Sequence, residues 1–522
     1  MTDYDVAIVG GGAVGTGLAI ELGQRGISTV VIERHHEPQP IPKGQNLTQR
    51  TTEHFHFWGC EAALRAARTR PQDAGIGGMT AYGALLSDYH YDWLNRALVR
   101  EFYFTDNERL PQYATEGVLR ARAAEIESVD LLYGWSGTGH EQDHDGVTVH
   151  LAEHRGDEAR NLRARYLVGC DGARSGVREA AGIAQSGADH GKVAALILFR
   201  SEELDEKLKR YPGKAFYNVL HPDFEGYWQF FGRVDRDTFF FHAPVPPGTT
   251  KGNFDFTSFL HRAIGAEVAL QIEYLGFWDL RVTQAEHYRQ GRVFIAGDAC
   301  HSHPPYGGYG INTGFEDARN LGWKLAASLQ GWGGLGLLDS YESERHPVFA
   351  STARDFIERF IEEDRAFLEA YSPERDKAEF AKKWATRNAG AEEVNKFEPN
   401  YEGSPIVGGA GAPSAYGGHE VRARPGHHLT PQRLSDRRNV FEVLGPRFTL
   451  LAFDAKEDAL TAFEAAAELS GTPLAVVRDT GSGGRQAYGA SLILVRPDHF
   501  VAWAGETGDP ATVLGRATGA IA

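Results

Sequence analysis

The chain has 522 residues, of which 42% are hydrophobic and 24% are charged, and its formal net charge is −16. This length exceeds what one hydrophobic core normally holds, so two or three domains are expected. The acidic balance argues against nucleic acid or an anionic membrane as a partner, because both attract basic surfaces. No apolar run reaches the length of a membrane span and no signal peptide is recognisable, which predicts a cytoplasmic protein.

Three widely spaced cysteines, Cys60, Cys170 and Cys300, are the only ones in the chain. Their spacing matches neither a disulfide framework nor a Cys/His zinc site. The sequence therefore predicts free thiols and no metal.

Residues 4–33 read YDVAIVGGGAVGTGLAIELGQRGISTVVIE, which is typical of a strand, a glycine turn, a helix ended by Gly26, and a second strand. Gly10, Gly12 and Gly15 form a Gly-x-Gly-x-x-Gly fingerprint, and Glu33 follows about 20 residues past the turn. The turn lets a pyrophosphate approach the helix N-terminus, and an acid at position 33 can accept both ribose hydroxyls. The motif predicts a dinucleotide site without distinguishing NAD from FAD.

A second copy of the same pattern, Gly331, Gly333 and Gly336, follows a predicted helix instead of a strand. Without the preceding strand the glycines have no phosphate-binding context. This copy is predicted to be a loop.

Between these copies, helices are predicted over 51–68 and 108–127, β-structure in parts of 77–105, including LVREFYFT, and a meander over 129–151. Residues 164–183 predict a strand ending at Gly169 and a helix from about Ser175. Asp171, which follows that strand, is compatible with either a structural or a functional role.

Residues 190–280 are rich in β-formers and aromatics, which predicts an antiparallel sheet with one buried face. Most of its large aromatic residues are interpreted as core, and a few are expected to line an apolar pocket. The residues concerned are Phe216, Tyr217, Trp228, Phe230, Phe231, Phe239 and Trp278.

Residues 293–329 predict a buried strand over 293–296, a turn at Gly297 and Asp298, a Pro/Gly-rich loop, and a helix starting near Asn312. Free amides at the start of that helix would face an anionic group. The candidates for its cap are Asn312 and Thr313, and those for its first turn are Glu316 and Asp317.

After position 329 the chain is predicted to be helical to about 395, then Gly/Pro-rich over 403–418, as in a linker or extended crossing. The remaining residues alternate between strand and helix patterns, ending in a helix from Asp509, like a small thioredoxin-type domain. Because no cysteine follows Cys300, this unit cannot do dithiol chemistry. A structural or oligomerisation role is expected.

Three motifs, GGGAVG with Glu33, CDGARS at 170–175 and AGDACHSHPPYGGYGINTG at 296–314, together resemble the single-component FAD-dependent aromatic hydroxylases, the phenol hydroxylase and p-hydroxybenzoate hydroxylase group. The resemblance covers roughly residues 1–350, and the C-terminal part resembles the phenol hydroxylase branch. It implies an α/β (α+β) protein with a Rossmann-like FAD-binding domain, an inserted antiparallel-sheet substrate domain and a thioredoxin-like domain. The FAD-binding domain is expected at 1–80 with 101–180 and 285–370, and the substrate domain at 81–100 with 181–284. Residues 371–420 are expected to form helix and linker, and 421–522 the thioredoxin-like domain.

The resemblance also assigns the site residues. Those expected to bind the cofactor are Gly10, Gly12, Ala13, Val14, Gly15, Glu33, Arg34, Lys43, Gln112, Asp171, Gly172, Arg174, Gly297, Asp298, Gly310, Ile311 and Asn312. Those expected to shape the catalytic pocket are Pro304, Pro305, Gly307 and Tyr309. Two positions depart from the family pattern: Lys43 stands where relatives often carry arginine, and Tyr309 where they usually carry glutamine.

The reaction implied is reduction of FAD by NAD(P)H, addition of O2 to give a flavin C4a-hydroperoxide, and transfer of its distal oxygen to an electron-rich ring. Candidates for the general base are His54, His242, His301 and His303. Two other functions stay open: a flavin oxidoreductase that inserts no oxygen, and a flavin-binding sensor or assembly subunit.

The resemblance implies a small aromatic substrate, and the sequence does not choose between a simple phenol and a fused polyketide ring. NADH and NADPH are not distinguished, because no 2′-phosphate site is recognisable. A homodimer is expected from the family resemblance.

Overall fold

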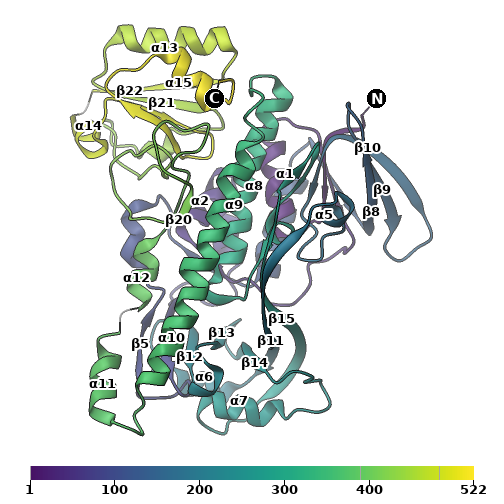
Figure 1. Ribbon diagram of the computed structural model, residues 1–522, viewed down its shortest axis with the longest axis vertical. Helices are drawn as coiled ribbons and strands as arrows, with labels where there is room; N and C mark the ends of the chain where they lie inside the picture. The colour runs from purple at the N-terminus through teal and green to yellow at the C-terminus, as the bar shows by residue number, and fades with distance from the viewer. Residues whose placement is uncertain (1, 388, 481, 522) are drawn as a thin grey trace.

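The computed structural model describes residues 2–387, 389–480 and 482–521. Within these residues, two eight-stranded sheets and one four-stranded sheet contain most of the strands. Figure 1 shows the second sheet at the bottom, the C-terminal unit at the top, and helices α8 (Tyr309–Gln330) and α9 (Ser340–Ala353) running through the middle. Every helix in this part of the chain is too short or too polar to cross a membrane.

The first sheet has a parallel centre in the order β17-β10-β1-β2-β7, with β16 and the β8–β9 hairpin added antiparallel. β1 and β2 are mostly buried, which is why both read as continuous apolar runs. The strand–helix–strand pattern predicted for 4–33 is confirmed. The strands are β1 Tyr4–Val9, β2 Thr29–Glu33, β7 Val129–Tyr133, β8 Trp135–Gln142, β9 Val147–Glu153, β10 Ala159–Gly169, β16 Arg289–Gln290 and β17 Val293–Ile295.

Helices α1 (Ala13–Gly23) and α8 pack closely against each other beside this sheet, because small residues lie at their contact. A Cβ atom added to Gly314 would lie 2.6 Å from Cγ2 of Val14 and 3.4 Å from Cα of Gly297. This packing brings the start of α1, the Gly297 turn and the start of α8 together. The other helices of this region are α2 Gln49–Phe57, α3 Glu61–Ala66, α4 Gln112–Ala124 and α5 Gly176–Ala180.

The second sheet has the order β18-β15-β11-β14-β13-β12-β4-β5, and its strand pairs are antiparallel except for the parallel pair β12–β4. One face packs on helices α6 (Glu202–Leu208) and α7 (Phe256–Ile264). The other face joins an aromatic cluster with α10 (Arg359–Ala370) and the 306–309 segment. The strands are β4 Gly77–Tyr82, β5 His90–Trp93, β11 Gln185–Arg200, β12 Lys214–Leu220, β13 Trp228–Arg233, β14 Thr238–Val245, β15 Gln271–Ala285 and β18 His301–Ser302.

After α9 the chain continues through α10 to α11 (Lys377–Ala385) and α12 (Ala389–Lys396), and then a two-stranded β19–β20 ladder. The C-terminal sheet has the order β22-β21-β23-β24, in which β21 pairs parallel with β22 and antiparallel with β23. Its topology follows the predicted α/β pattern, and its assignment as thioredoxin-like stays a prediction. The elements are β19 Phe397–Asn400, β20 Ser414–Tyr416, β21 Phe448–Phe453, α13 Glu457–Ser470, β22 Leu474–Asp479, α14 Ser482–Tyr488, β23 Leu492–Val495, β24 Val501–Gly505 and α15 Pro510–Ala517.

Two predictions of local structure were wrong. Much of LVREFYFT, residues 98–105, was predicted to be β-structure but lies in a 3₁₀ helix, Arg96–Phe102. Asn95 caps this helix by accepting a hydrogen bond from the Ala97 amide at 3.3 Å. Helix α8 begins at Tyr309 instead of near Asn312, because Gly308 adopts φ +70° and serves as its N-cap. Neither Asn312 nor Thr313 is therefore the cap.

Candidate active site

The glycine fingerprint forms a tight turn between β1 and α1. Gly10 has φ +106°, and a Cβ atom there would lie 2.3 Å from the carbonyl oxygen of Cys170, while one at Gly15 would lie 2.0 Å from the carbonyl of Gly10. At Gly12 a Cβ atom would meet only Oε1 of Glu116, at 3.8 Å, so the helix start is open there. No side chain caps α1 and its first turn, which includes Ala13 and Val14, contains no acid. An anionic pyrophosphate fits this end of the helix.

Glu33 ends β2 beside that turn, as predicted. Its carboxylate accepts hydrogen bonds from the amides of Gly11 and His35, each at 2.8 Å, and these bonds fix its direction. The neighbouring Arg34 is exposed. A carboxylate with a fixed direction at this strand end can accept hydrogen bonds from the two hydroxyls of a ribose.

Replacing Glu33 with alanine is expected to weaken FAD retention by about 1–3 kcal/mol, the cost of losing a hydrogen bond to a charged partner. The measurement is the Kd for FAD of the apoprotein, followed by flavin fluorescence. Glu33→Gln, which keeps one acceptor oxygen, should lose less. An unchanged Kd in the alanine variant would rule out the ribose assignment.

Several of the predicted cofactor residues are linked between α4 and the Gly297 turn. Gln112 begins α4, accepts from the Gly44 amide at 3.1 Å and donates to Glu116 at 2.8 Å. Lys43 is exposed and acts electrostatically on both Glu116 and Asp298, so these three groups lie near one another. The surrounding protein raises the pKa of the Asp298 carboxyl, whose side chain is still accessible.

The Gly297 turn is held by a residue that the sequence placed elsewhere. Asp317, predicted for the first turn of the helix, lies in its interior and is buried. It accepts from the Gly297 amide at 3.0 Å, from Nε of Arg345 at 2.7 Å, and bonds Nε2 of His301 at 2.7 Å. Asp317 therefore fixes the turn that carries Asp298.

The segment after β10 has a clear structural role. Asp171 accepts from the Val177 amide at 3.1 Å and from the Ser175 hydroxyl, and thereby holds the start of α5. Gly172 has φ +88°, and Arg174 is exposed. The predicted contact of Asp171, Gly172 and Arg174 with FAD or NAD(P)H stays a prediction.

At the start of α8, Asn312 ties the helix to the 46–51 segment. Its Oδ1 accepts from the Thr48 amide at 2.9 Å and the Thr51 hydroxyl at 2.6 Å, and its Nδ2 donates to the carbonyls of Asn46 and Gly308 at 2.8 and 2.7 Å. Gly310 and Ile311 complete the first turn, which contains no acid. Glu316, also predicted for that turn, lies further along α8 and pairs with Arg50 and His54.

The Pro304–Gly308 loop packs onto the second sheet. Tyr306 lies with its ring centroid 4.4 Å from that of Trp228, and its hydroxyl accepts from the Trp228 amide at 3.3 Å. Gly307 has φ +66°, and a Cβ atom there would meet the Tyr309 ring at 2.2 Å. Pro304 is buried, and Pro305 precedes the turn that leads into α8. This loop joins the start of α8 to the aromatic face.

Tyr309, which was expected to shape the pocket, is almost completely buried. Its hydroxyl donates to Glu393 of α12, which also accepts from the Trp93 indole at 3.1 Å. Burial raises the pKa of Glu393 to about 7. A second indole–carboxyl pair has the same arrangement. The Trp228 indole donates to Asp364 at 2.5 Å, and burial raises the pKa of that acid to about 6. The sequence did not indicate a role for either acid, because each acid is far along the chain from the tryptophan that it binds.

The four candidate base histidines differ in which of their ring nitrogens have hydrogen-bond partners. His54 and His301 are buried and bonded to Glu316 and Asp317. Among the residues that the structure describes, Nδ1 of His54, Nδ1 of His242 and Nε2 of His303 have no hydrogen-bond partner. Burial lowers the pKa of His242 to about 3 and that of His303 to about 4, so both are neutral at pH 7.

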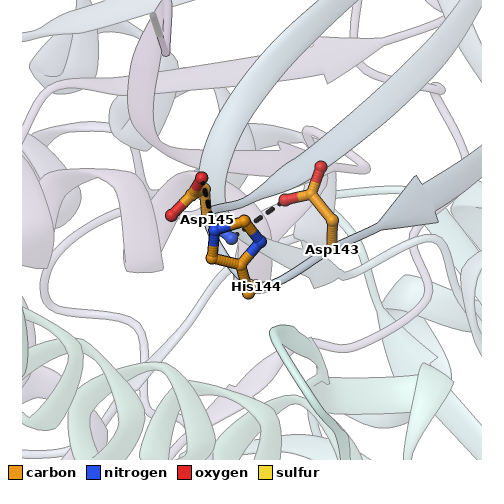
Figure 2. A group of neighbouring side chains, drawn as sticks. All are labelled: Asp143, His144 and Asp145. Atoms are coloured by element: carbon orange, nitrogen blue, oxygen red, sulfur yellow. Dashed lines mark hydrogen bonds and ion pairs between the residues drawn. The ribbon is translucent and has the colours of Figure 1, made fainter.

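One group of side chains in the described part of the chain has the spacing to hold a metal ion, and it lies in the exposed β8–β9 turn (Figure 2). Asp143 accepts from the amides of Asp145 and Gly146 and pairs with Arg163. His144 pairs with Asp145. These bonds hold the turn of the β8–β9 hairpin and tie it to β10, and the group carries no functional assignment.

Comparisons with known proteins agree with this geometry. Residues 3–355 match the FAD binding domain family, and residues 422–521 match the aromatic-ring hydroxylase C-terminal family. The chain is 31% identical to 4-methyl-5-nitrocatechol 5-monooxygenase of a Burkholderia species, over 96% of this chain and 94% of that protein. It is also 31% identical to a putative polyketide hydroxylase of Streptomyces halstedii, over 97% of this chain and 94% of that protein.

Solved structures show the same fold over the whole length. K252c-soaked RebC superposes with a TM-score of 0.83 at 28% identity, and aklavinone-11 hydroxylase with FAD and aklavinone with a TM-score of 0.81 at 27% identity. Each covers 99% of this chain and 99% of its own. The chain therefore belongs to the FAD-dependent aromatic-ring hydroxylases. It is an FAD-dependent monooxygenase, and the fold class, cofactor and reaction class expected from the sequence are confirmed.

Proposed function

We propose that this protein hydroxylates a phenolic ring with NAD(P)H and O2, where the start of α8 meets the aromatic face of the second sheet. One observation carries the proposal: the buried aromatic cluster of that face is continuous with Tyr306 and Tyr309 at the start of α8. An apolar wall beside a helix N-terminus suits a flat substrate next to an anionic cofactor group.

The residues present fit FAD. The open start of α1 would take its pyrophosphate, Glu33 its ribose, Asp298 its ribityl chain, and the amides at Gly310–Asn312 the pyrimidine edge of its ring. Bound FAD supplies the redox chemistry, accepting two electrons from NAD(P)H and delivering one atom of O2 to the ring while the other leaves as water.

The chain itself supplies orientation and a dry environment. Trp228 and Tyr306 pack against each other at the junction, with their rings tilted by 45°, and exclude water from one side of the site. The positive end of α8 stabilises negative charge on the group that it faces. Asp317 and Asn312 hold the two backbone segments that would contact the cofactor.

The test is NAD(P)H consumption and O2 uptake by the purified yellow protein against a panel of phenols, with products weighed by mass spectrometry. We expect a substrate-stimulated rate and a product heavier by one oxygen atom. Peroxide formation without oxygen insertion for every phenol would contradict the proposal. Running each reaction with NADH and with NADPH identifies the donor.

The relatives include enzymes named for a small catechol and for polyketides, so the panel should contain both simple and fused rings. A homodimer, a cytoplasmic location, the lack of a nucleic-acid partner and the domain boundaries stay predictions from the sequence.

A further inference from the structure

Arg109 is a buried cation whose charge is not compensated. It lies in the two-residue strand β6 (Glu108–Arg109), is 5% exposed, and its guanidinium carbon lies 4.8 Å from the centroid of the Phe216 ring. Nη1 donates to Oδ1 of Asn46 at 2.6 Å. Nε and Nη2 have no partner among the residues that the structure describes. These two nitrogens form the edge of the guanidinium that binds a carboxylate side-on.

The surroundings of Arg109 make this arrangement costly. Across the described part of the chain, no carboxylate pairs with it, and the nearby charge of Arg70 is also positive. Burial, followed by Arg70, lowers the pKa of Arg109 to about 9. A charge removed from water without a counter-ion destabilises the protein that contains it. Its retention points to an anion that arrives from outside the chain.

Gln45, the residue before Asn46, is a second buried polar side chain without partners in this part of the described fold. It is 4% exposed, and its side-chain Oε1 and Nε2 both lack partners within the described ranges. Its carbonyl accepts from the amide of Leu110, the residue after Arg109, at 3.2 Å. Because Gln45 is opposite Leu110 in this two-stranded pairing, its side chain lies on the other side of the strands from those of Asn46 and Arg109.

Arg109 lies against the aromatic face of the second sheet. Phe216, Gly232 and Phe240 are cross-strand neighbours on three adjacent strands. A Cβ atom on Gly232 would lie 2.5 Å from Nη2 of Arg109 and 2.2 Å from the Phe240 ring. The absence of a side chain at Gly232 therefore leaves room for the guanidinium on this face.

The same residue is also linked to the cofactor side. Asn46, which binds Arg109 through its side chain, accepts from Nδ2 of Asn312 through its carbonyl at 2.8 Å. Arg109 is thus connected through one residue to the first turn of α8. Two further unpartnered polar atoms, Oδ1 of Asn218 and Nδ1 of His242, lie on the same face, on either side of Phe230.

We propose that Arg109 binds an anionic oxygen of the aromatic substrate, either a ring carboxylate or an ionised phenol. This inference rests on the proposed function, because it specifies the substrate of that same site. An ionised phenol is also the more electron-rich form of the ring, so holding it would favour attack by an electrophilic oxygen. The bound anion would compensate the charge that is unpaired in the free protein.

The experiment measures binding to the FAD-loaded enzyme without NAD(P)H, from the change in flavin absorbance. Two matched pairs separate the two sources of charge: 4-hydroxybenzoate with its methyl ester, and 4-nitrophenol, above its solution pKa, with its methyl ether. We expect the wild type to bind the charged member of at least one pair tenfold or more tightly than the neutral one. Arg109→Gln should remove that preference, and Arg109→Lys should restore part of it.

An exposed arginine on the opposite face, Arg262 of α7, provides the control, because Arg262→Gln should keep the wild-type preference. The Arg109→Gln variant should unfold at no lower temperature than the wild type, since the charge it removes is unpaired. A wild type with no preference for either charged probe, or an unchanged preference in Arg109→Gln, overturns the proposal. Because no turnover is involved, these outcomes are independent of whether oxygen is inserted.

Discussion

Replacing Glu344 of α9 with alanine is expected to destabilise the protein by about 3–5 kcal/mol, the scale for breaking a buried ion pair by removing one partner. Its carboxylate accepts from Arg496 at 2.6 and 2.9 Å, from Lys324 and Asn320 at 2.7 Å each, and from the Ser404 hydroxyl at 2.7 Å. Without it, the fully buried Lys324 loses the carboxylate that it pairs with, and the fully buried Arg496 keeps, among the described residues, only Asp498. The measurement is the free energy of unfolding from denaturant titration.

The location of this cluster extends the expected effect beyond stability. Lys324 and Asn320 belong to α8, while Arg496 follows β23 of the C-terminal sheet, so Glu344 joins the helix at the cofactor site to the C-terminal unit. The alanine variant should therefore also release FAD more readily. Glu362→Ala, at an exposed position of α10, is the matched control and should change neither property. Wild-type stability in Glu344→Ala would show that the cluster does not hold the two parts together.

Local patterns in the sequence were sufficient for the framework of the cofactor side. The apolar run 6–9, the fingerprint glycines and Glu33 predicted β1, α1 and β2, because each element there is determined by neighbours in the sequence. The same holds for the strand that ends at Gly169 and for the loop at Gly331, which ends α8 with φ +82°.

Long-range contacts determined what sequence reasoning missed. Asp317 was expected in the first turn of its helix, but α8 begins at Tyr309, which places Asp317 in the helix interior. Its partners Gly297, His301 and Arg345 come from the 297–301 segment and from α9, far from it in the sequence. Arg109 gave no signal, because an unpaired charge can be identified only after all its neighbours are known. The start of α8 was displaced by three residues because two glycines with positive φ, Gly307 and Gly308, allow the helix to begin earlier.

The buried acid Glu393 predicts a specific pH dependence of stability. Burial is the largest influence on its carboxyl and raises its pKa from 4.5 to about 7, against the opposing effects of Tyr309, Arg96 and Trp93, while Asp364 raises it further. A raised carboxyl pKa means that the folded protein binds the proton more tightly than the unfolded chain. The resulting stabilisation is present below pH 4.5 and is lost as the pH rises through about 7.

The expected result is that the stability curves of the wild type and Glu393→Gln coincide at low pH and diverge as the pH rises. At pH 4 Glu393 is protonated in the folded protein and largely protonated in the unfolded chain, so Glu393→Gln, which is also neutral, should match the wild type. Its Oε1 can accept from the Trp93 indole while its Nε2 donates to the Tyr309 hydroxyl. At pH 8.5 the wild type carries a buried negative charge, and the variant should be more stable by about 3 kcal/mol, since each pKa unit corresponds to about 1.4 kcal/mol. Melting temperatures of both proteins across this range measure the difference.

The neighbouring Glu392 provides the control, because it is exposed and pairs with Arg359 at the surface. Glu392→Gln should follow the wild type at every pH, since an exposed pair contributes little to stability. A constant difference between Glu393→Gln and the wild type from pH 5.5 to 8.5 would mean that Glu393 does not titrate in this range. In that case Arg96 would hold the carboxylate ionised throughout, and the contact between Tyr309 and Glu393 would be a charged hydrogen bond under all conditions in which the enzyme acts.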